Sequence, residues 1–285
     1  MFLRQILPSV LFGLMGTAAF ADTLYFSAIP DEDASALVAR FTKVADYLEA
    51  QLGVDVEFVP VKSYPAAVTA FTNDQVQLAW FGGLTSVQAR LANPGAQSIA
   101  QGKEDPTFIS YLIANTSTGL EPSADFPMAA RTMTFTFGAK TSTSGRLMPE
   151  FYIREATGLP PEDFFGDVGF SGDHSQTLRL VASGAYQLGV LNYTVYDKAL
   201  AEKSPETETA KVIWQTPPYP DYNWVIRGDV DARFGEGFTQ KVQAALIGMT
   251  DPDLLASFPR EAFIPAQNSD FDAIETTAKA LGLLE

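Results

Sequence analysis

The sequence predicts an α/β protein made of two lobes. Apolar, strand-like segments alternate with helical periodicity from residue 23 onward, a pattern typical of sheets flanked by helices. Two loop-like segments, 115–130 and 216–224, interrupt this alternation and contain proline. We expect them to be crossings between lobes. Residues 22–115 and 216–285 would then form lobe 1, and residues 116–215 would form lobe 2.

The first 21 residues predict export from the cytoplasm. They contain Arg4, an apolar run from Ile6 to Ala19, and the small-x-small pattern Ala19-Phe20-Ala21. The apolar run is shorter than the roughly 20 residues that span a bilayer, which argues against a membrane anchor. We expect a signal peptide over residues 1–21, cleaved near Ala21.

Composition excludes several classes of function. The chain has no cysteine and a single histidine, His174, so thiol chemistry, disulfides and the usual zinc or copper centres are not expected. Removing the leader leaves 18 basic and 34 acidic residues, a formal charge of −16. This charge disfavours nucleic acid and anionic lipid as partners. An anionic ligand would have to be held by local N–H groups, hydroxyls and helix dipoles.

Lobe 1 is expected to open with a strand, a helix and a strand. Residues 23–29 are apolar, apolar side chains recur at helical spacing over residues 37–52, and residues 54–59 alternate. A second helix leads to a strand over 77–81, which ends at Gly82-Gly83. Ligands gather at the carboxyl ends of strands in such sheets, and glycine allows close approach. The alternative is a plain glycine turn. Residues 98–101 and 107–114 predict two further strands.

Lobe 2 contains the most informative stretch, residues 132–155. Thr132–Phe137 alternates as a strand, and after Gly138 comes the hydroxyl run Thr141-Ser142-Thr143-Ser144, followed by a helix. The N-terminus of a helix offers unpaired N–H groups and a positive dipole, which suits an anion. The alternative is that one hydroxyl caps the helix. Four consecutive hydroxyl residues exceed what a cap requires.

A second polar turn, Ser171-Gly172-Asp173-His174-Ser175, repeats this arrangement before another helix. Strands are expected over 164–170, 187–191 and 211–214. The segment 216–224, TPPYPDYNW, suits a crossing back to lobe 1, and the remaining residues have helical patterns.

The order of these motifs resembles the periplasmic phosphonate/phosphite/phosphate-binding proteins of ATP-binding-cassette (ABC) importers. The segments that carry the resemblance are LYFSAIPDE, DYLEAQLGVDVEFVPVKSY, QLAWFGG, AKTSTSG, SGDH and PPYPDYNW. It covers essentially the whole mature chain and includes relatives labelled selenate-binding. It implies the type II periplasmic binding protein fold, with two lobes, each a mixed sheet flanked by helices, joined by a two-segment hinge.

The resemblance also implies the site. The hydroxyls and N–H groups of the STSG turn would bind the oxyanion, and the histidine of the second turn would join them. An acid in the second crossing would accept a hydrogen bond from a protonated ligand oxygen. The residues implied are Ser142, Thr143, Ser144, His174, Asp221, Tyr64 and Tyr111. A periplasmic location, an inner-membrane permease as partner, a monomeric state and no cofactor are also implied.

Asp221 bears on which oxyanion is bound. A carboxylate repels an oxyanion unless the ligand carries an O–H to donate. With Asp221 in the cleft, the site favours monoprotonated phosphate-like ions over sulfate or selenate; with Asp221 in an exposed turn, this preference disappears. Arg146, just after the STSG turn, could add a charge-assisted contact or point to solvent, and of the two we expect the solvent-facing position. Trp80, Phe81, Tyr193 and Trp224 could wall the cleft or belong to the core.

Other functions stay open at this stage. The same fold could bind selenate or sulfate, or an organic ligand such as a sulfonate or a thiamine precursor. A secreted Ser/His hydrolase is a remote alternative, since there is no G-x-S-x-G elbow and no supported triad order. The sequence therefore predicts a binding protein, not an enzyme, that captures a small oxyanion.

Overall fold

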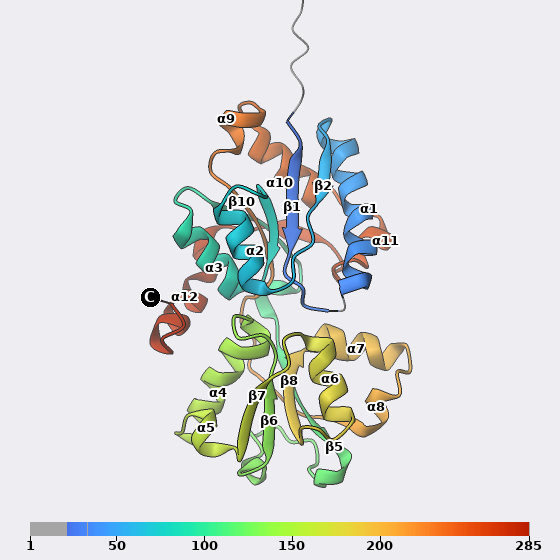
Figure 1. Cartoon of the computed structure of the whole chain (residues 1–285), viewed down its shortest axis with the longest axis vertical. Coiled ribbons are helices and arrows are strands. Elements are labelled where there is room, and N and C mark those ends of the chain that lie inside the picture. Colours follow the sequence, from blue (N-terminus) through green and yellow to red (C-terminus); the bar gives the residue numbers. More distant parts are fainter. Residues whose placement is uncertain (1–21, 33, 285) are drawn as a thin grey trace, which may run out of the picture.

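The chain folds into two lobes, one above the other in Figure 1. The computed structural model describes residues 22–32 and 34–284, so the predicted signal peptide lies outside the described residues. Each lobe is built on one mixed sheet, with helices on both of its sides. The predicted α/β class and two-lobed architecture are confirmed.

Lobe 1 is built on a six-stranded sheet with the order β11-β4-β10-β3-β1-β2. Strands β1, β2 and β3 are parallel, and β10 runs antiparallel to both β3 and β4. Helices α2, α3 and α12 lie on one side of the sheet, and α1, α10 and α11 lie on the other (Figure 1). The strands are β1 (Leu24–Ala28), β2 (Val56–Phe58), β3 (Leu78–Phe81), β4 (Gln97–Gly102), β10 (Asn223–Ile226) and β11 (Phe263–Pro265). The helices are α1 (Ala34–Leu52), α2 (Tyr64–Thr72), α3 (Gly83–Ala92), α9 (Val230–Phe234), α10 (Phe238–Ile247), α11 (Pro252–Leu255), η5 (Asn268–Phe271) and α12 (Asp272–Ala280).

Lobe 2 is built on a five-stranded sheet with the order β7-β6-β8-β5-β9. Strands β6, β7 and β8 are parallel, and β5 is antiparallel to β8 and β9. Helices α4 and α5 lie on one side and α6 to α8 on the other. The strands are β5 (Ser110–Asn115), β6 (Thr134–Phe137), β7 (Asp167–Phe170), β8 (Leu188–Asn192) and β9 (Ala210–Gln215). The helical segments are η2 (Thr116–Thr118), η3 (Met128–Ala130), η4 (Thr143–Leu147), α4 (Met148–Thr157), α5 (Pro161–Phe164), α6 (His174–Ala182), α7 (Tyr193–Ala201) and α8 (Glu206–Thr209).

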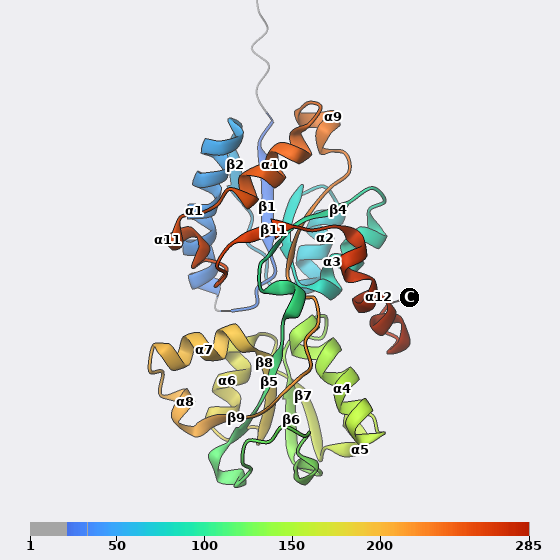
Figure 2. The same ribbon diagram turned by 180° about the vertical axis from the view of Figure 1, so that it is seen from behind.

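The two crossings between lobes run side by side as a paired hinge, seen from behind in Figure 2. The first includes the short helix η1 (Asp105–Thr107). Tyr219 N donates to Phe108 O at 2.9 Å, and the two residues form an antiparallel bridge. A buried ion pair supports the hinge, because Arg260 Nη2 lies 2.7 Å from Asp105 Oδ1. The Arg260 guanidinium also lies over the Phe108 and Tyr222 rings, 5.2 Å from each centroid.

The structure corrects the position of the first crossing. The strand predicted over residues 107–114 was expected in lobe 1, but the corresponding strand β5 pairs with β8 and β9 in the sheet of lobe 2. The chain therefore crosses after β4, near residues 103–109. The error has a physical cause, since a period-2 pattern identifies a strand but not the sheet in which it pairs. The expected helical C-terminal region also contains β11, which forms the edge of the lobe 1 sheet.

No described helix is long and apolar enough to cross a membrane.

Candidate oxyanion-binding site

The three hydroxyl residues of the turn after β6, Ser142, Thr143 and Ser144, make different interactions. Ser142 Oγ accepts the backbone N–H of the residue three positions later at 2.9 Å and so caps the helical turn η4. Thr143 Oγ1 accepts the backbone N–H of Leu84 at 2.9 Å, which joins lobe 2 to the start of α3 in lobe 1. The Ser144 carbonyl accepts the Ser110 hydroxyl at 2.6 Å, while Ser144 Oγ is buried with no hydrogen-bond partner among the described residues. The capping alternative thus applies to Ser142, and Ser144 keeps its hydroxyl for another partner.

His174 lies against this turn and presents a neutral ring. A Cβ added to Gly145 would lie 3.1 Å from His174 Cε1, so the two polar turns meet. The backbone N–H of Asn192 donates to His174 Nδ1 at 3.2 Å, which places the ring proton on Nε2. Burial lowers the pKa of His174 to about 4, and the charge of Glu32 acts in the opposite direction. Nε2–H is therefore a neutral donor, and Nε2 is buried with no hydrogen-bond partner among the described residues.

Asp221 reaches the site from the second crossing. Its Oδ1 accepts the Gly83 N–H at 2.9 Å at the start of α3, and its Oδ2 is buried with no partner among the described residues. Burial raises the pKa of Asp221 to about 7, although the Gly83 N–H and the Thr143 and Ser144 hydroxyls partly oppose this rise. These hydroxyls are close to the carboxyl but form no directed hydrogen bond to Oδ2. The exposed-turn alternative for Asp221 is wrong, since its side chain is fully buried.

The glycine pair after β3, Gly82-Gly83, leaves room for the Asp221 carboxyl and the Thr143 hydroxyl beside the backbone. A Cβ on Gly82 would lie 3.1 Å from Asp221 Oδ1 and 3.2 Å from Thr143 Oγ1. Gly82 has φ −75°, which any residue can adopt, so the need for glycine here is one of space. The N–H groups at the start of α3 bind protein groups: Gly83 donates to the carboxylate, and the next residue donates to the threonine. The pair is therefore more than a plain turn, because it admits the hinge acid and the lobe 2 turn.

Tyr64 at the start of α2 contributes a phenol from lobe 1. Burial raises its pKa well above the ordinary value, with Asp31 adding to the effect, so the hydroxyl keeps its proton near neutral pH. The Ser142 side chain also acts on the pKa of Tyr64, which places lobe 1 and the lobe 2 turn close together. Buried polar atoms without a partner among the described residues thus gather from lobe 1, lobe 2 and the hinge. They are Tyr64 Oη, Ser144 Oγ, His174 Nε2 and Asp221 Oδ2, with Thr141 Oγ1 nearby on the same turn.

The lobes also meet through residues that the sequence did not identify as functional. The backbone N–H of His174 donates to Asp31 O at 3.0 Å. Glu32 pairs with Arg40 in its own lobe at 2.8 Å and with Lys198 of lobe 2 at 3.3 Å. Both acids lie a few residues after β1, so their position near the carboxyl end of a strand was the available signal.

Asn192, at the end of β8, is another residue that the sequence did not identify as functional. Its backbone fixes the His174 ring, and its amide Nδ2 donates to Tyr222 Oη at 3.0 Å. It therefore links lobe 2 to the second crossing. An asparagine that caps a helix is common, so the sequence alone gave no reason to select it.

Tyr111 is not brought to this group. It lies on β5, and its ring makes edge contacts with Tyr193 and Tyr196 of α7. Its hydroxyl lies 3.5 Å from Asp197 Oδ2, and burial raises its pKa to about 12. The side chain therefore faces α7 and not the other predicted site residues.

Arg146 is also placed differently from the expectation of a solvent-facing side chain. Its guanidinium pairs with Glu150 and lies over the Phe137 and Phe170 rings, 4.8 and 5.0 Å from their centroids. The side chain is only 14% exposed. It secures the helix after the turn.

The aromatic residues at the strand ends are largely core. Trp80, Phe81 and Trp224 are buried in the hydrophobic core that includes lobe 1. Trp80 stacks on Tyr222 of the second crossing with a centroid distance of 5.5 Å. Tyr193 packs on Phe108 of the first crossing at 4.9 Å. These rings therefore support the hinge and the sheet behind the site.

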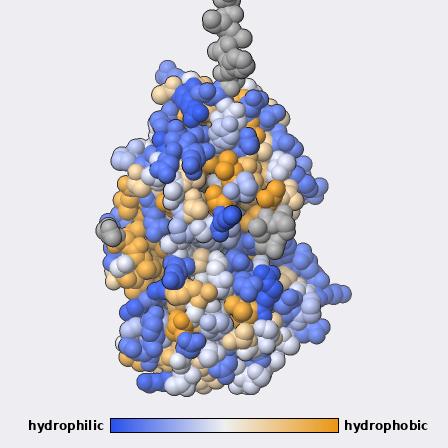
Figure 3. All heavy atoms as spheres, viewed as in Figure 1, coloured by the Kyte–Doolittle hydropathy of each residue, from blue (hydrophilic) through white to orange (hydrophobic). Residues whose placement is uncertain are grey.

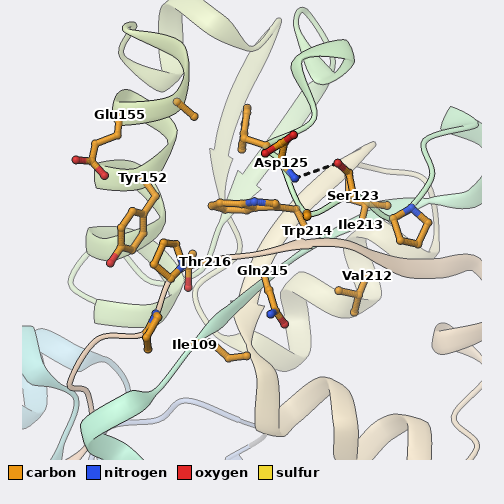
Figure 4. Close-up of a pocket in the computed structure, with 16 residues that line it drawn as sticks. Ile109, Ser123, Asp125, Tyr152, Glu155, Val212, Ile213, Trp214, Gln215 and Thr216 are labelled. Carbon is orange, nitrogen blue, oxygen red and sulfur yellow. Dashed lines mark hydrogen bonds between the residues drawn. The ribbon is translucent and has the colours of Figure 1, made fainter.

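A cavity of about 860 Å³ lies on lobe 2, between α4 and β9, away from the predicted site residues. Figure 4 shows the Trp214 ring between Tyr152 and the loop that carries Ser123 and Asp125. None of the predicted site residues lines it. Its walls are mainly apolar, and none of the buried, unpartnered donors between the lobes lines it. This cavity is therefore less suited to an anion than the group of polar atoms between the lobes.

The described residues contain no group of three or more His, Asp or Glu side chains that could hold a metal ion. The groups between the lobes that are buried without a partner among the described residues are hydroxyls, one imidazole and one carboxyl.

Two α/β lobes, a paired hinge and a buried polar site between them define a solute-binding protein of the bilobal periplasmic type. A family model described as "ABC transporter, phosphonate, periplasmic substrate-binding protein" matches residues 26–271. The chain therefore belongs to the periplasmic phosphonate substrate-binding proteins of ABC transporters.

Individual relatives agree with this assignment. The chain is 37% identical over 283 residues to a probable ABC transporter phosphite-binding protein, PhnD1, of Prochlorococcus marinus (strain MIT 9301), covering 96% of this chain and 95% of the relative. The solved structure of that PhnD1 in complex with methylphosphonate is similar, with a TM-score of 0.87 at 36% identity, covering 92% of this chain and 99% of the other. A binding protein of a phosphonate transporter from Pseudomonas aeruginosa has a TM-score of 0.77 at 19% identity, covering 90% and 85% of the two chains, and supports the fold alone.

Proposed function

We propose that this chain captures a monoprotonated phosphonate- or phosphite-type anion between its lobes and delivers it to an inner-membrane permease. The observation that carries the proposal is the set of buried, unpartnered polar atoms that converges from both lobes and the hinge. Three of them, on Tyr64, Ser144 and His174, can donate a hydrogen bond. The fourth, Asp221 Oδ2, can accept one. A tetrahedral anion with several bare oxygens and one O–H matches this arrangement.

Asp221 is the discriminating group. If the carboxyl is ionised, it accepts the O–H of a monoprotonated ligand; if it is protonated, it donates to a dianion. In either case one proton is shared between Asp221 and the ligand. Sulfate and selenate carry no proton near neutral pH, so they would need Asp221 to bind its own proton at a cost that grows with pH. The pKa of about 7 supports preference for the phosphorus oxyanions in neutral or alkaline surroundings.

The names of the relatives point to the same class of ligand, since one is a probable phosphite-binding protein and its solved structure holds methylphosphonate. Tyr64, Ser142, Thr143, Ser144, His174 and Asp221 are the proposed ligand-binding group. Tyr111 is left out of this group because its hydroxyl faces Asp197. We further propose that the protein is exported with cleavage near Ala21, acts as a monomer, and binds without catalysing a reaction.

The test uses phosphite, methylphosphonate, phosphate, sulfate and selenate at about pH 8. Calorimetric titration measures the binding of each anion, and thermal unfolding measures the stabilisation that it produces. A ligand present at 100 times its dissociation constant should add roughly 2.7 kcal/mol to the free energy of unfolding. We expect phosphite or methylphosphonate to produce this stabilisation and sulfate to produce little. Stabilisation by sulfate or selenate without a response to the phosphorus ligands would contradict the proposal. Stabilisation by an alkanesulfonate alone would favour the organic-ligand alternative.

A further inference from the structure

A cavity of about 670 Å³ lies beside the proposed ligand-binding group and has walls from both lobes. Tyr64 lines it and also belongs to the proposed ligand-binding group, so this cavity adjoins the site. Residues 30, 32 and 61–65 form the lobe 1 wall, and residues 139–141, 170, 172, 173 and 179 form the lobe 2 wall. We call this cavity the mouth. Figure 3 shows the molecule in the orientation of Figure 1, with both hydrophilic and hydrophobic side chains along the boundary between the lobes.

The lining of the mouth contains three basic and two acidic side chains, so its formal charge is +1, opposite in sign to that of the whole chain. Lys62 of lobe 1 and Lys140 of lobe 2 are exposed at its two walls, and Arg179 is exposed beside them. None of these three groups forms an ion pair within 4 Å with another described residue. Lys140 Nζ lies 5.2 Å above the Phe170 ring, which holds the charge near the opening. Arg179 Nε donates to Gln176 Oε1 at 3.0 Å.

The two carboxylates that line the mouth are already engaged. Glu32 lies between Arg40 and Lys198, which neutralise it from two directions. Asp173 Oδ1 accepts the Gln176 N–H at 2.7 Å and caps α6. The mouth thus has an excess of positive charge, whereas the 285-residue chain has a formal charge of −15.

We propose that the mouth is an anion-collecting vestibule in which Lys62 and Lys140 gather small oxyanions before they reach the buried site. This inference rests on the proposed function and adds a kinetic role to it. The buried site uses neutral donors, which give little attraction at long range. A cleft with an excess of one sign of charge focuses the field and raises the rate of association of ions of the opposite sign. The vestibule would thereby offset the repulsion that an anion meets at the rest of this acidic surface.

The experiment measures association and dissociation rates for methylphosphonate and phosphite by stopped-flow tryptophan fluorescence. Trp80 stacks on Tyr222 of the hinge and provides the reporter. The test variant is Lys62→Gln/Lys140→Gln. The matched control, Lys211→Gln/Lys279→Gln, removes the same charge from two exposed lysines that do not line the mouth. A second control, Lys62→Arg/Lys140→Arg, keeps both charges.

We expect the Gln variant of the mouth to lower the association rate constant about three- to tenfold at low ionic strength. The dissociation rate constant should change less than about twofold, because the lysines act before the anion is buried. The difference should fade near 1 M salt, where the Debye length is about 3 Å. The matched control and the Arg variant should stay close to the wild-type rates.

Equal effects of the mouth variant and the matched control would overturn the vestibule, as would a slow Arg variant or a change confined to dissociation. Wild-type binding in these cases would leave the proposed function intact. A wild-type protein that binds neither ligand would overturn both proposals.

Discussion

Replacing Asp221 with asparagine should weaken binding and stabilise the empty protein at the same time. The variant keeps an oxygen for the Gly83 N–H, now 2.9 Å from Oδ1, but replaces the unpartnered Oδ2 with an NH₂ group. The NH₂ cannot accept the ligand O–H. Loss of a hydrogen bond to a charged group costs about 1.5–3 kcal/mol, so the dissociation constant for phosphite or methylphosphonate should rise about 10- to 150-fold.

The effect on stability has the opposite sign and depends on pH. The pKa of this carboxyl is raised from 3.8 to about 7 by burial. A group with a raised pKa in the folded state contributes stability that is complete below about pH 4 and is lost as the pH rises through about 7. An uncharged amide avoids this loss. The variant should therefore gain about 2–4 kcal/mol over the wild type at pH 8 and little at pH 4, which corresponds to a rise in Tm on the order of 5–10 °C.

Calorimetric titration and thermal unfolding at several pH values measure both effects. Asp46→Asn, at an exposed position of α1, is the control for removing one negative charge. An Asp221→Asn protein with the wild-type ligand preference would remove Asp221 from the site. A Tm difference that does not grow between pH 4 and pH 8 would refute the account of its buried charge.

Three further predictions concern the ring, the glycine pair and the hinge. His174 should stay neutral at pH 6 with its proton on Nε2, because burial lowers its pKa to about 4; nitrogen NMR of this single imidazole checks it, and a charged ring would contradict it. Gly82→Ala should weaken ligand binding at least about tenfold, since its Cβ would lie 3.1 Å from Asp221 Oδ1. Unaltered affinity in calorimetry would contradict this prediction, because it would show that Asp221 and Thr143 can move to make room for the added methyl group. Arg260→Met should cost about 3–5 kcal/mol of stability by leaving the Asp105 carboxylate buried and unpaired. Denaturant unfolding measures this cost; the added Asp105→Asn change should restore part of it, and a fully additive double variant would contradict the coupling.

Much of the local chemistry was determined by the sequence. The hydroxyl run before α4 and the polar turn before α6 both lie at helix starts, as their patterns predicted. The glycine pair after β3 also lies at the carboxyl end of its strand. These features follow from short-range rules, because capping residues, glycine and hydrophobic periodicity act within a few positions of the chain.

The tertiary structure alone decided which of these groups meet. Pairing of the two crossings carries Asp221 to the start of α3, 138 positions away along the chain, where it accepts the Gly83 N–H. The pairing of β5 in lobe 2 directs Tyr111 against α7, which no local pattern of that strand could reveal. The physical reason is the same in both cases. The pKa of a carboxyl, the partner of a strand and the direction of a side chain depend on burial and on contacts between distant segments, and a single sequence records neither.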